Sequence, residues 1–160
     1  MIQGKSETSA VGAGADLMKS LIYNDEVLES LATIILAGSR PSAKTVEALP
    51  QLKKMLFDYD IYTLSFMSDE DVEELYKTIR ENGLKPADKK LKDKLLAIRD
   101  NARVFVAIAE RHNSVRAFID RIQADGDGLT KLTAEFTGDG CEYPLKLVGP
   151  VACKKFLSQF

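Results

Sequence analysis

The sequence predicts a single all-α domain, a compact arrangement of about eight helices. Apolar residues recur three and four positions apart through most of the chain, which is the spacing of one helix face. Strand signals are nearly missing, because no long alternating run of Val, Ile, Thr or Tyr lies between turn residues. The length of 160 residues suits one domain, and a hydrophobic content of 45% is enough for a core.

The composition excludes several classes of protein. Charged residues make up 29% of the chain and the net charge is −2, which fits neither a disordered chain nor one that is basic throughout. The apolar runs are shorter than the roughly 18 residues of a transmembrane helix, and the N-terminus lacks a secretory signal. Two cysteines and one histidine are too few for a disulfide scaffold or a standard zinc site. We therefore expect a soluble intracellular monomer with no metal, no cofactor and no membrane contact.

The chain divides into a short N-terminal arm and the helical domain. Residues 1–15 are rich in Gly, Ser, Thr and Ala and predict a flexible arm, which leaves 16–160 for the domain. A short amphipathic segment over 16–23 comes first, and a helix over 25–38 follows, with Gly38 as its stop signal. The density of Leu, Ile and Ala in its second half predicts a fully buried helix.

Start signals predict the next two helices. Pro41 can open a helix whose apolar positions continue to Leu56, and Pro50 is expected to bend or split it. Ser68 can cap the following helix, because its hydroxyl can accept a hydrogen bond from a free backbone N–H. The three acids after it complement the positive end of the helix dipole. Gly83 is expected to end this helix.

The second half of the chain contains four further predicted helices and one loop. Pro86 opens a long basic helix that runs to about His112. Apolar positions from Val115 to Ile122 predict another helix, which a Gly- and Asp-rich stretch ends. Residues 129–136 are expected to form a short helix and residues 137–144 a loop. A last helix over 149–160 is expected to run to the chain end.

Acids and bases are separated along the chain. Over 58–78 seven acids stand against Lys77 alone, whereas over 80–121 eleven bases stand against six acids. Within the basic stretch, Lys90 and Lys94 are four residues apart and share one face of a helix. Such a face can bind a phosphate backbone although the whole chain is slightly acidic. The alternative is a solvated face of mixed charge.

The most informative motif is the turn that leads into the last helix. Gly149 permits a positive φ and a close approach of another backbone, and Pro150 suits the first position of a helix. The free N–H groups that follow would point away from the positive helix end, where a phosphate can bind. The alternative is a helix start that binds no ligand. The residues expected to bind phosphate in this motif are Val148, Gly149, Val151, Ala152, Lys154 and Lys155.

Three segments carry a combined pattern: 34–44, then 66–75 with Gly83, Lys94 and 98–103, and finally 147–153. Taken together and in this order, they resemble the helix-hairpin-helix DNA glycosylase superfamily. The nearest branch is that of 3-methyladenine DNA glycosylase I, which carries a similar Asn-Ala-Arg segment and a similar Val-Gly-x-x-x-Cys hairpin. The resemblance implies a DNA repair protein that ends in a helix-hairpin-helix motif, binds duplex DNA and hydrolyses the N-glycosidic bond of a flipped, damaged base. It also implies a cytoplasmic location, or a nuclear or nucleoid one with the DNA.

The sequence departs from this family where the family has its chemistry. Gly38 and Ser39 stand where glutamines are usual, and no residue after Gly149 corresponds to the usual catalytic aspartate. The zinc ligands and the tryptophan of the nearest branch are also missing. The expected last helix stops at Phe160, which indicates a shortened chain or a minimal or inactive relative. We favour a DNA N-glycosylase with no assigned catalytic residue, and keep as the alternative a non-catalytic helical domain that binds DNA or a protein.

A few other side chains are candidates for the site. Ser39, Tyr59 and Tyr62 are the expected pocket for the flipped base. Phe66 could also stack on that base, because aromatic faces hold flipped bases, and core packing is the alternative for the three aromatic residues. His112 is expected to compensate a helix dipole rather than to catalyse. Both cysteines are expected to be free thiols, with Cys153 buried.

Overall fold

The structure is a computed structural model that describes residues 24–38, 40–84, 90–124 and 126–160, and these residues are all-helical, as predicted. A helix over 24–37 comes first. The elements that follow it are α2 (Ala43–Met55), the 3-10 helix η1 (Phe57–Tyr59), α3 (Ile61–Ser65), α4 (Asp69–Glu81), α5 (Leu91–His112), α6 (Val115–Gln123), α7 (Gly128–Thr137) and α8 (Pro150–Leu157). The predictions for the N-terminal arm, the segment over 16–23, Ser39 and Pro86 lie outside the described residues.

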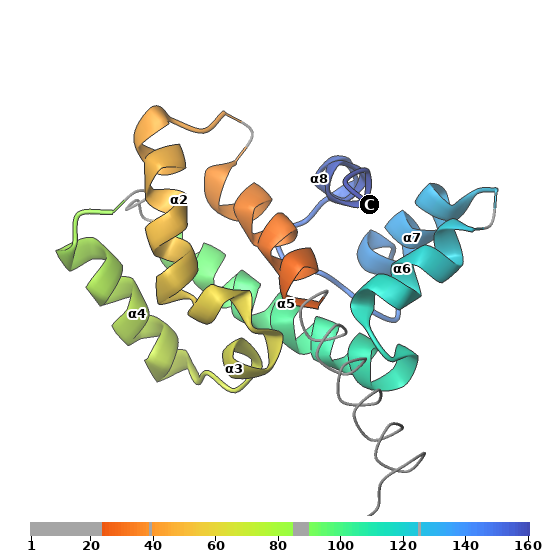
Figure 1. Cartoon of the computed structure of the whole chain (residues 1–160), viewed down its shortest axis with the longest axis horizontal. Helices are drawn as coiled ribbons and strands as arrows, with labels where there is room; N and C mark the ends of the chain where they lie inside the picture. The colour runs from red at the N-terminus through yellow and green to blue at the C-terminus, as the bar shows by residue number, and fades with distance from the viewer. Residues whose placement is uncertain (1–23, 39, 85–89, 125) are drawn as a thin grey trace, which may run out of the picture.

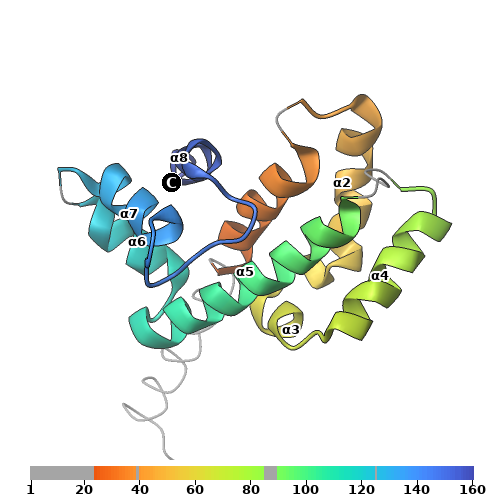
Figure 2. The ribbon, with the colours of Figure 1, turned by 180° about the vertical axis from the view of Figure 1, so that it is seen from behind.

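The long helix α5 organises the fold. It contacts α3 and α4 towards one end and α6 at the other, and α7 packs on both α6 and α8. The helix over 24–37 and α8 lie side by side over the same side of α5 (Figures 1 and 2). Among the described residues, no helix is both long and apolar enough to span a membrane.

The first described helix buries one face and not its whole circumference, so the prediction of a fully buried helix is wrong. Thr33, Ile34 and Ala37, in its second half, are partly exposed. Leu28, Leu31 and Leu36 have almost no exposed surface, and Glu26 is the exposed position within the helix. Gly38 adopts a φ of 72° and donates its N–H to the carbonyl of Ile34 at 3.0 Å. A left-handed glycine at this point ends the helix, which confirms its predicted stop.

Both ends of α4 form as predicted. The Ser68 hydroxyl accepts from the N–H of Asp71 at 3.1 Å, and the Asp71 carboxylate accepts from the N–H of Ser68 at 2.9 Å. This reciprocal pair is a capping box. At the other end Gly83 has a φ of 67°, and Leu84 donates its N–H to the carbonyl of Ile79 at 3.2 Å. A glycine in this conformation lets the last carbonyls find donors, so the chain leaves the helix there.

The predictions for the ends and interior of α2 need correction. The helix begins after Ser42, whose hydroxyl accepts from the N–H of Thr45 at 3.1 Å, and Pro41 lies outside it. Pro50 lies inside α2 and does not split it. The carbonyl that loses its donor belongs to Val46, four residues earlier, and Val46 and Pro50 are both exposed. Water can therefore satisfy that carbonyl, which lowers the cost of the proline.

The end of the chain also differs from the prediction. α8 stops at Leu157 and does not continue to the chain end. Helices α7 and α8 contact each other, but the connection between them covers 138–149 and is partly buried through Tyr143, Leu145 and Val148. The helix-hairpin-helix ending is therefore not confirmed.

Candidate nucleic-acid interface

A cavity of about 780 Å³ lies where four segments meet: the end of the helix over 24–37, the start of α5, the chain just before α8, and the start of α8. We call it the α5–α8 cleft. Its lining residues are Ile34, Ile35, Gly38, Lys90, Asp93, Lys94, Leu147, Gly149, Pro150, Val151, Ala152 and Lys155. Most of these residues are apolar, and the polar ones come from the first turn of α5 and from α8.

The cleft brings together residues that the sequence analysis selected on separate grounds. Lys90 and Lys94 came from a charge pattern, and they line the same cavity as the turn before α8. The predicted phosphate-binding residues that line it are Gly149, Val151, Ala152, Lys155, Lys90 and Lys94. Val148 is buried in the core, and Lys154 is exposed but does not line the cleft.

The charges around the cleft favour an anion. Three lysines line it, together with one carboxylate, that of Asp93. The Lys94 ammonium lies 3.5 Å from the carbonyl oxygen of Leu36, at the end of the helix over 24–37. A cation compensates the negative end of a helix dipole there, so Lys94 has a structural partner as well as a place on the cleft wall.

The start of α8 borders the cleft without a side-chain cap. The residue before this helix is Gly149, which has no side chain that could accept a hydrogen bond from the first N–H groups. In α8 the first intrahelical bond runs from the N–H of Cys153 to the carbonyl of Gly149 at 2.9 Å. The N–H groups of Val151 and Ala152 precede that bond, so they are available to an acceptor from outside the helix. The start of α7 also lacks a side-chain cap, but it does not line the cleft.

The predicted role of Gly149 needs correction. Its φ is −84° and its ψ is 178°, an extended conformation that any residue adopts, and an added Cβ would meet nothing within 4 Å. The positive φ in this turn belongs to Leu147, at 56°, and the Leu147 side chain is 61% exposed. A glycine at position 149 therefore leaves open space beside the start of α8, and the backbone conformation there does not require a glycine.

Asn101 fixes the chain that leads into this turn, and the sequence analysis missed that role. Its side chain is fully buried in α5. Its Nδ2 donates to the carbonyl of Lys146 at 3.2 Å, and its Oδ1 accepts from the N–H of Lys146 at 2.7 Å. The signal available in the sequence was an amide within the apolar face of a long helix, where a polar group needs a partner.

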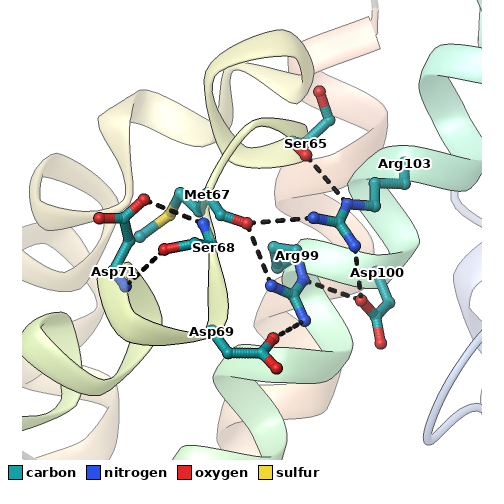
Figure 3. A network of polar contacts seen from close by, with 8 residues as sticks. All are labelled: Ser65, Met67, Ser68, Asp69, Asp71, Arg99, Asp100 and Arg103. Carbon is teal, nitrogen blue, oxygen red and sulfur yellow. Dashed lines mark hydrogen bonds and ion pairs between the residues drawn. The ribbon is translucent and has the colours of Figure 1, made fainter.

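The arginines of the segment over 98–103 hold the chain between α3 and α4 (Figure 3). Arg99 is buried and donates to the carbonyl of Met67 at 3.0 Å, to Asp69 at 2.7 Å and to Asp100 at 2.8 Å. Arg103 donates to the same Met67 carbonyl at 3.1 Å and to the carbonyl of Ser65 at 2.9 Å. These contacts give the segment a structural role and leave both arginines outside the α5–α8 cleft.

The tyrosines expected in a base pocket do not line the cleft. Tyr59 is 1% exposed and belongs to the core, and burial raises the pKa of its hydroxyl. Tyr62 is half-buried against the core, and burial together with nearby acids raises its pKa. Core packing, the alternative to a base pocket, describes both tyrosines. It is wrong for Phe66, which is 84% exposed and does not line the cleft either.

His112 and Cys153 pack against other residues of the fold and do not line the α5–α8 cleft. His112 ends α5, and its ring packs on Phe118 with the centroids 4.7 Å apart. Burial, with help from Arg121 and Arg111, lowers the pKa of this imidazole. Cys153 is a buried free thiol, as predicted, and burial raises its pKa to about 11. A thiol with so high a pKa is a poor nucleophile at neutral pH.

Metal binding and similarity to known proteins give no further assignment. No group of three or more His, Cys, Asp and Glu side chains within the described parts of the chain could hold a metal ion. Comparison of the chain with protein-family models, with curated proteins and with solved structures finds no match.

Proposed function

We propose that this protein binds duplex DNA at the α5–α8 cleft and excises a damaged base as a DNA N-glycosylase. One observation carries the proposal: three lysines and the uncapped start of α8, from segments far apart in the sequence, border one cavity. Lysines and free helix N–H groups are the groups that bind backbone phosphates. A cavity of about 780 Å³ with apolar walls is in the size range of sites for small organic ligands, which include a flipped base.

Asp93 is the candidate for the chemistry in this proposal. It is the carboxylate that lines the cleft among the described residues, and it is exposed, so it can reach a bound sugar. The reaction breaks the bond between the base nitrogen and C1′ of the sugar, and the base leaves with the electron pair. Water adds its oxygen to C1′ and gives a proton to the Asp93 carboxylate. That carboxylate also stabilises the positive charge that develops on the sugar in such a transition state.

Replacing Asp93 by Asn tests the enzymatic part of the proposal. We expect base excision to fall by about 100-fold or more, the usual contribution of a general base. The affinity for DNA should be unchanged or higher, because the substitution removes a negative charge from a site that binds phosphate. The measurement is the release of abasic sites, scored by strand cleavage in alkali, from duplex oligonucleotides that each carry one damaged base. Glu70→Gln, an acid in the first turn of α4 outside the cleft, is the matched control.

The same assay separates the glycosylase from the non-catalytic alternative. Abasic sites from at least one lesion, lost in Asp93→Asn and kept in Glu70→Gln, support the enzyme. If no lesion yields abasic sites while the wild-type protein binds duplex DNA, the chain is the non-catalytic DNA-binding domain. If duplex DNA is not bound at all, both forms of the proposal are wrong.

Replacing Gly149 by Val tests the phosphate-binding turn. The backbone of Gly149 suits a β-branched residue and an added Cβ meets nothing, so we expect the free energy of unfolding to be unchanged or slightly raised. The new side chain should obstruct the N–H groups of Val151 and Ala152 and weaken duplex DNA binding by about 1–3 kcal/mol. Gly126→Val, another open glycine that does not line the cleft, is the control. Unchanged DNA affinity in Gly149→Val, with the fold intact by circular dichroism, would show that phosphate does not bind there.

A further inference from the structure

A second groove lies where α3, α4 and the chain around η1 meet. Its volume is about 470 Å³. Apolar side chains of Phe57, Phe66, Met67 and Leu75 line it, together with the acids Asp71 and Glu74. Phe66 is 84% exposed and Phe57 is 48% exposed, which is unusual for two large aromatic side chains that share one groove. Exposed apolar groups gathered in this way mark interaction sites in soluble proteins. We call this the acidic aromatic groove.

The backbone holds Phe57 in an exposed position at a cost. Phe57, Asp58 and Tyr59 have φ values of 56°, 54° and 61°, three consecutive residues in the left-handed region. Left-handed helical conformations are unfavourable for L-amino acids other than glycine, because the Cβ atom approaches the following carbonyl oxygen. Burial of Tyr59, together with Leu56 and Ile61, offsets that cost. The consequence of the turn is that Tyr59 enters the core while Phe57 lines the groove.

The arginine network fixes the other side of the groove. Figure 3 shows the carbonyl oxygen of Met67 directed toward Arg99 and Arg103, whereas the Met67 side chain extends away from them, beside Asp71. Arg99 and Arg103 both donate to that carbonyl. The methionine is therefore held with its flexible, polarisable side chain in the groove, a property that suits a binding surface.

The charged side chains that line the groove are carboxylates. Asp71 and Glu74 line the groove, and Glu70 and Asp58 lie in the segments that form it. In the described structure, no base forms an ion pair with Glu70, Asp71 or Glu74. Lys77 lies on the same helix but does not line the groove. An apolar groove edged by carboxylates that form no ion pair is complementary to an apolar side chain flanked by cations.

We propose that the acidic aromatic groove is the docking site for a lysine- or arginine-bearing amphipathic segment of another protein. An aromatic or aliphatic side chain of that segment packs between Phe57 and Phe66. Its flanking cations pair with Glu74 and Asp71. The α3–α4 junction lies on the opposite side of the molecule from α8 in both views (Figures 1 and 2), so a partner here leaves the α5–α8 cleft accessible.

Binding of three synthetic peptides tests the proposal. The first is a 14-residue helical peptide of Lys and Leu with its leucines on one face, the second has Glu in place of each Lys, and the third has Ser in place of each Leu. Fluorescence anisotropy gives the affinities, and NMR of the protein gives the residues that respond. The Lys/Leu peptide should bind at least about tenfold more tightly than either of the others, and the signals of Phe57, Phe66 and Met67 should shift.

Four variants locate the binding. Phe66→Ser and Glu74→Lys should each weaken the Lys/Leu peptide by about fivefold or more, the scale of an aromatic anchor or a reversed charge at an interface. The matched controls Val46→Ser and Glu81→Lys change an exposed apolar residue and an acid outside the groove, and they should change the affinity by less than about twofold. None of the four should alter duplex DNA binding beyond the effect of its charge.

Three outcomes would overturn the proposal. The first is that no peptide binds up to about 1 mM. The second is that the controls weaken binding as much as the groove variants. The third is that the protein self-associates through the groove, seen as a dimer in sedimentation that Phe66→Ser dissolves, because a second copy of the chain would then be the occupant.

Discussion

Replacing Arg99 by Met is expected to lower the free energy of unfolding by about 2–4 kcal/mol, the scale of losing two or three hydrogen bonds from a buried charged group. Methionine keeps much of the volume but removes the donors to the Met67 carbonyl, Asp69 and Asp100. The loss stays below that of a fully buried ion pair, because the Asp69 side chain is 77% exposed and can return to water. The measurement is urea unfolding, with the midpoint and the slope fitted separately.

Two further variants separate the network from charge alone. Arg99→Lys keeps the charge, but one ammonium cannot reach three acceptors that a planar guanidinium serves together, so it should recover less than half of the loss. Arg116→Met removes an exposed pair with Asp120 on α6 and should cost less than about 1 kcal/mol. If Arg99→Met unfolds within about 0.5 kcal/mol of the wild type, the network does not hold the α3–α4 connection.

Both ends of α4 and the end of the helix over 24–37 were predictable because their causes are local. The capping box of Ser68 and Asp71 depends on residues three apart, and Gly38 and Gly83 adopt the positive φ that ends a helix. One prediction was wrong because of an exposure that the sequence does not display. Pro50 does not split α2, since Pro50 and Val46, whose carbonyl loses its donor, are both exposed and water can satisfy that carbonyl.

Other features of the chain backbone had no local signal. Leu147 and the three residues of η1 have positive φ without a glycine among them. Contacts distant in sequence hold them, such as the Asn101 side chain on Lys146 and the burial of Tyr59. For the same reason Gly149, the residue that looked suited to a positive φ, has an extended backbone.

The α5–α8 cleft was predicted in its parts and not as a whole. The sequence selected Lys90 and Lys94 from charge, and the turn around Gly149 from helix-start chemistry. It could not show that these two segments meet, because their contact depends on how α8 packs beside the helix over 24–37. The apolar wall of Ile34 and Ile35 and the carboxylate of Asp93 were missed, since each is unremarkable within its own helix.

The double substitution Lys90→Ala/Lys94→Ala is expected to change how DNA binding depends on salt. Each phosphate that a lysine neutralises contributes a slope of roughly −0.9 to the plot of log affinity against log salt concentration. Removing two lysines from the cleft wall should therefore reduce the magnitude of the slope by about one to two. Affinity should fall alike for all sequences, because phosphate contacts carry no base information. The measurement is fluorescence anisotropy of labelled duplexes at several salt concentrations.

Lys154 and Lys155 supply the matched comparison for this prediction. They are neighbours on α8 with the same charge, but only Lys155 lines the cleft. Lys155→Ala should reduce the slope by about one, whereas Lys154→Ala should leave it nearly unchanged, as should Lys54→Ala/Lys77→Ala, which removes two lysines away from the cleft. An unchanged slope in Lys90→Ala/Lys94→Ala would mean that these lysines only solvate the start of α5. Equal effects of Lys154→Ala and Lys155→Ala would then place the DNA on the outer face of α8 rather than in the cleft, because both lysines are exposed on that helix.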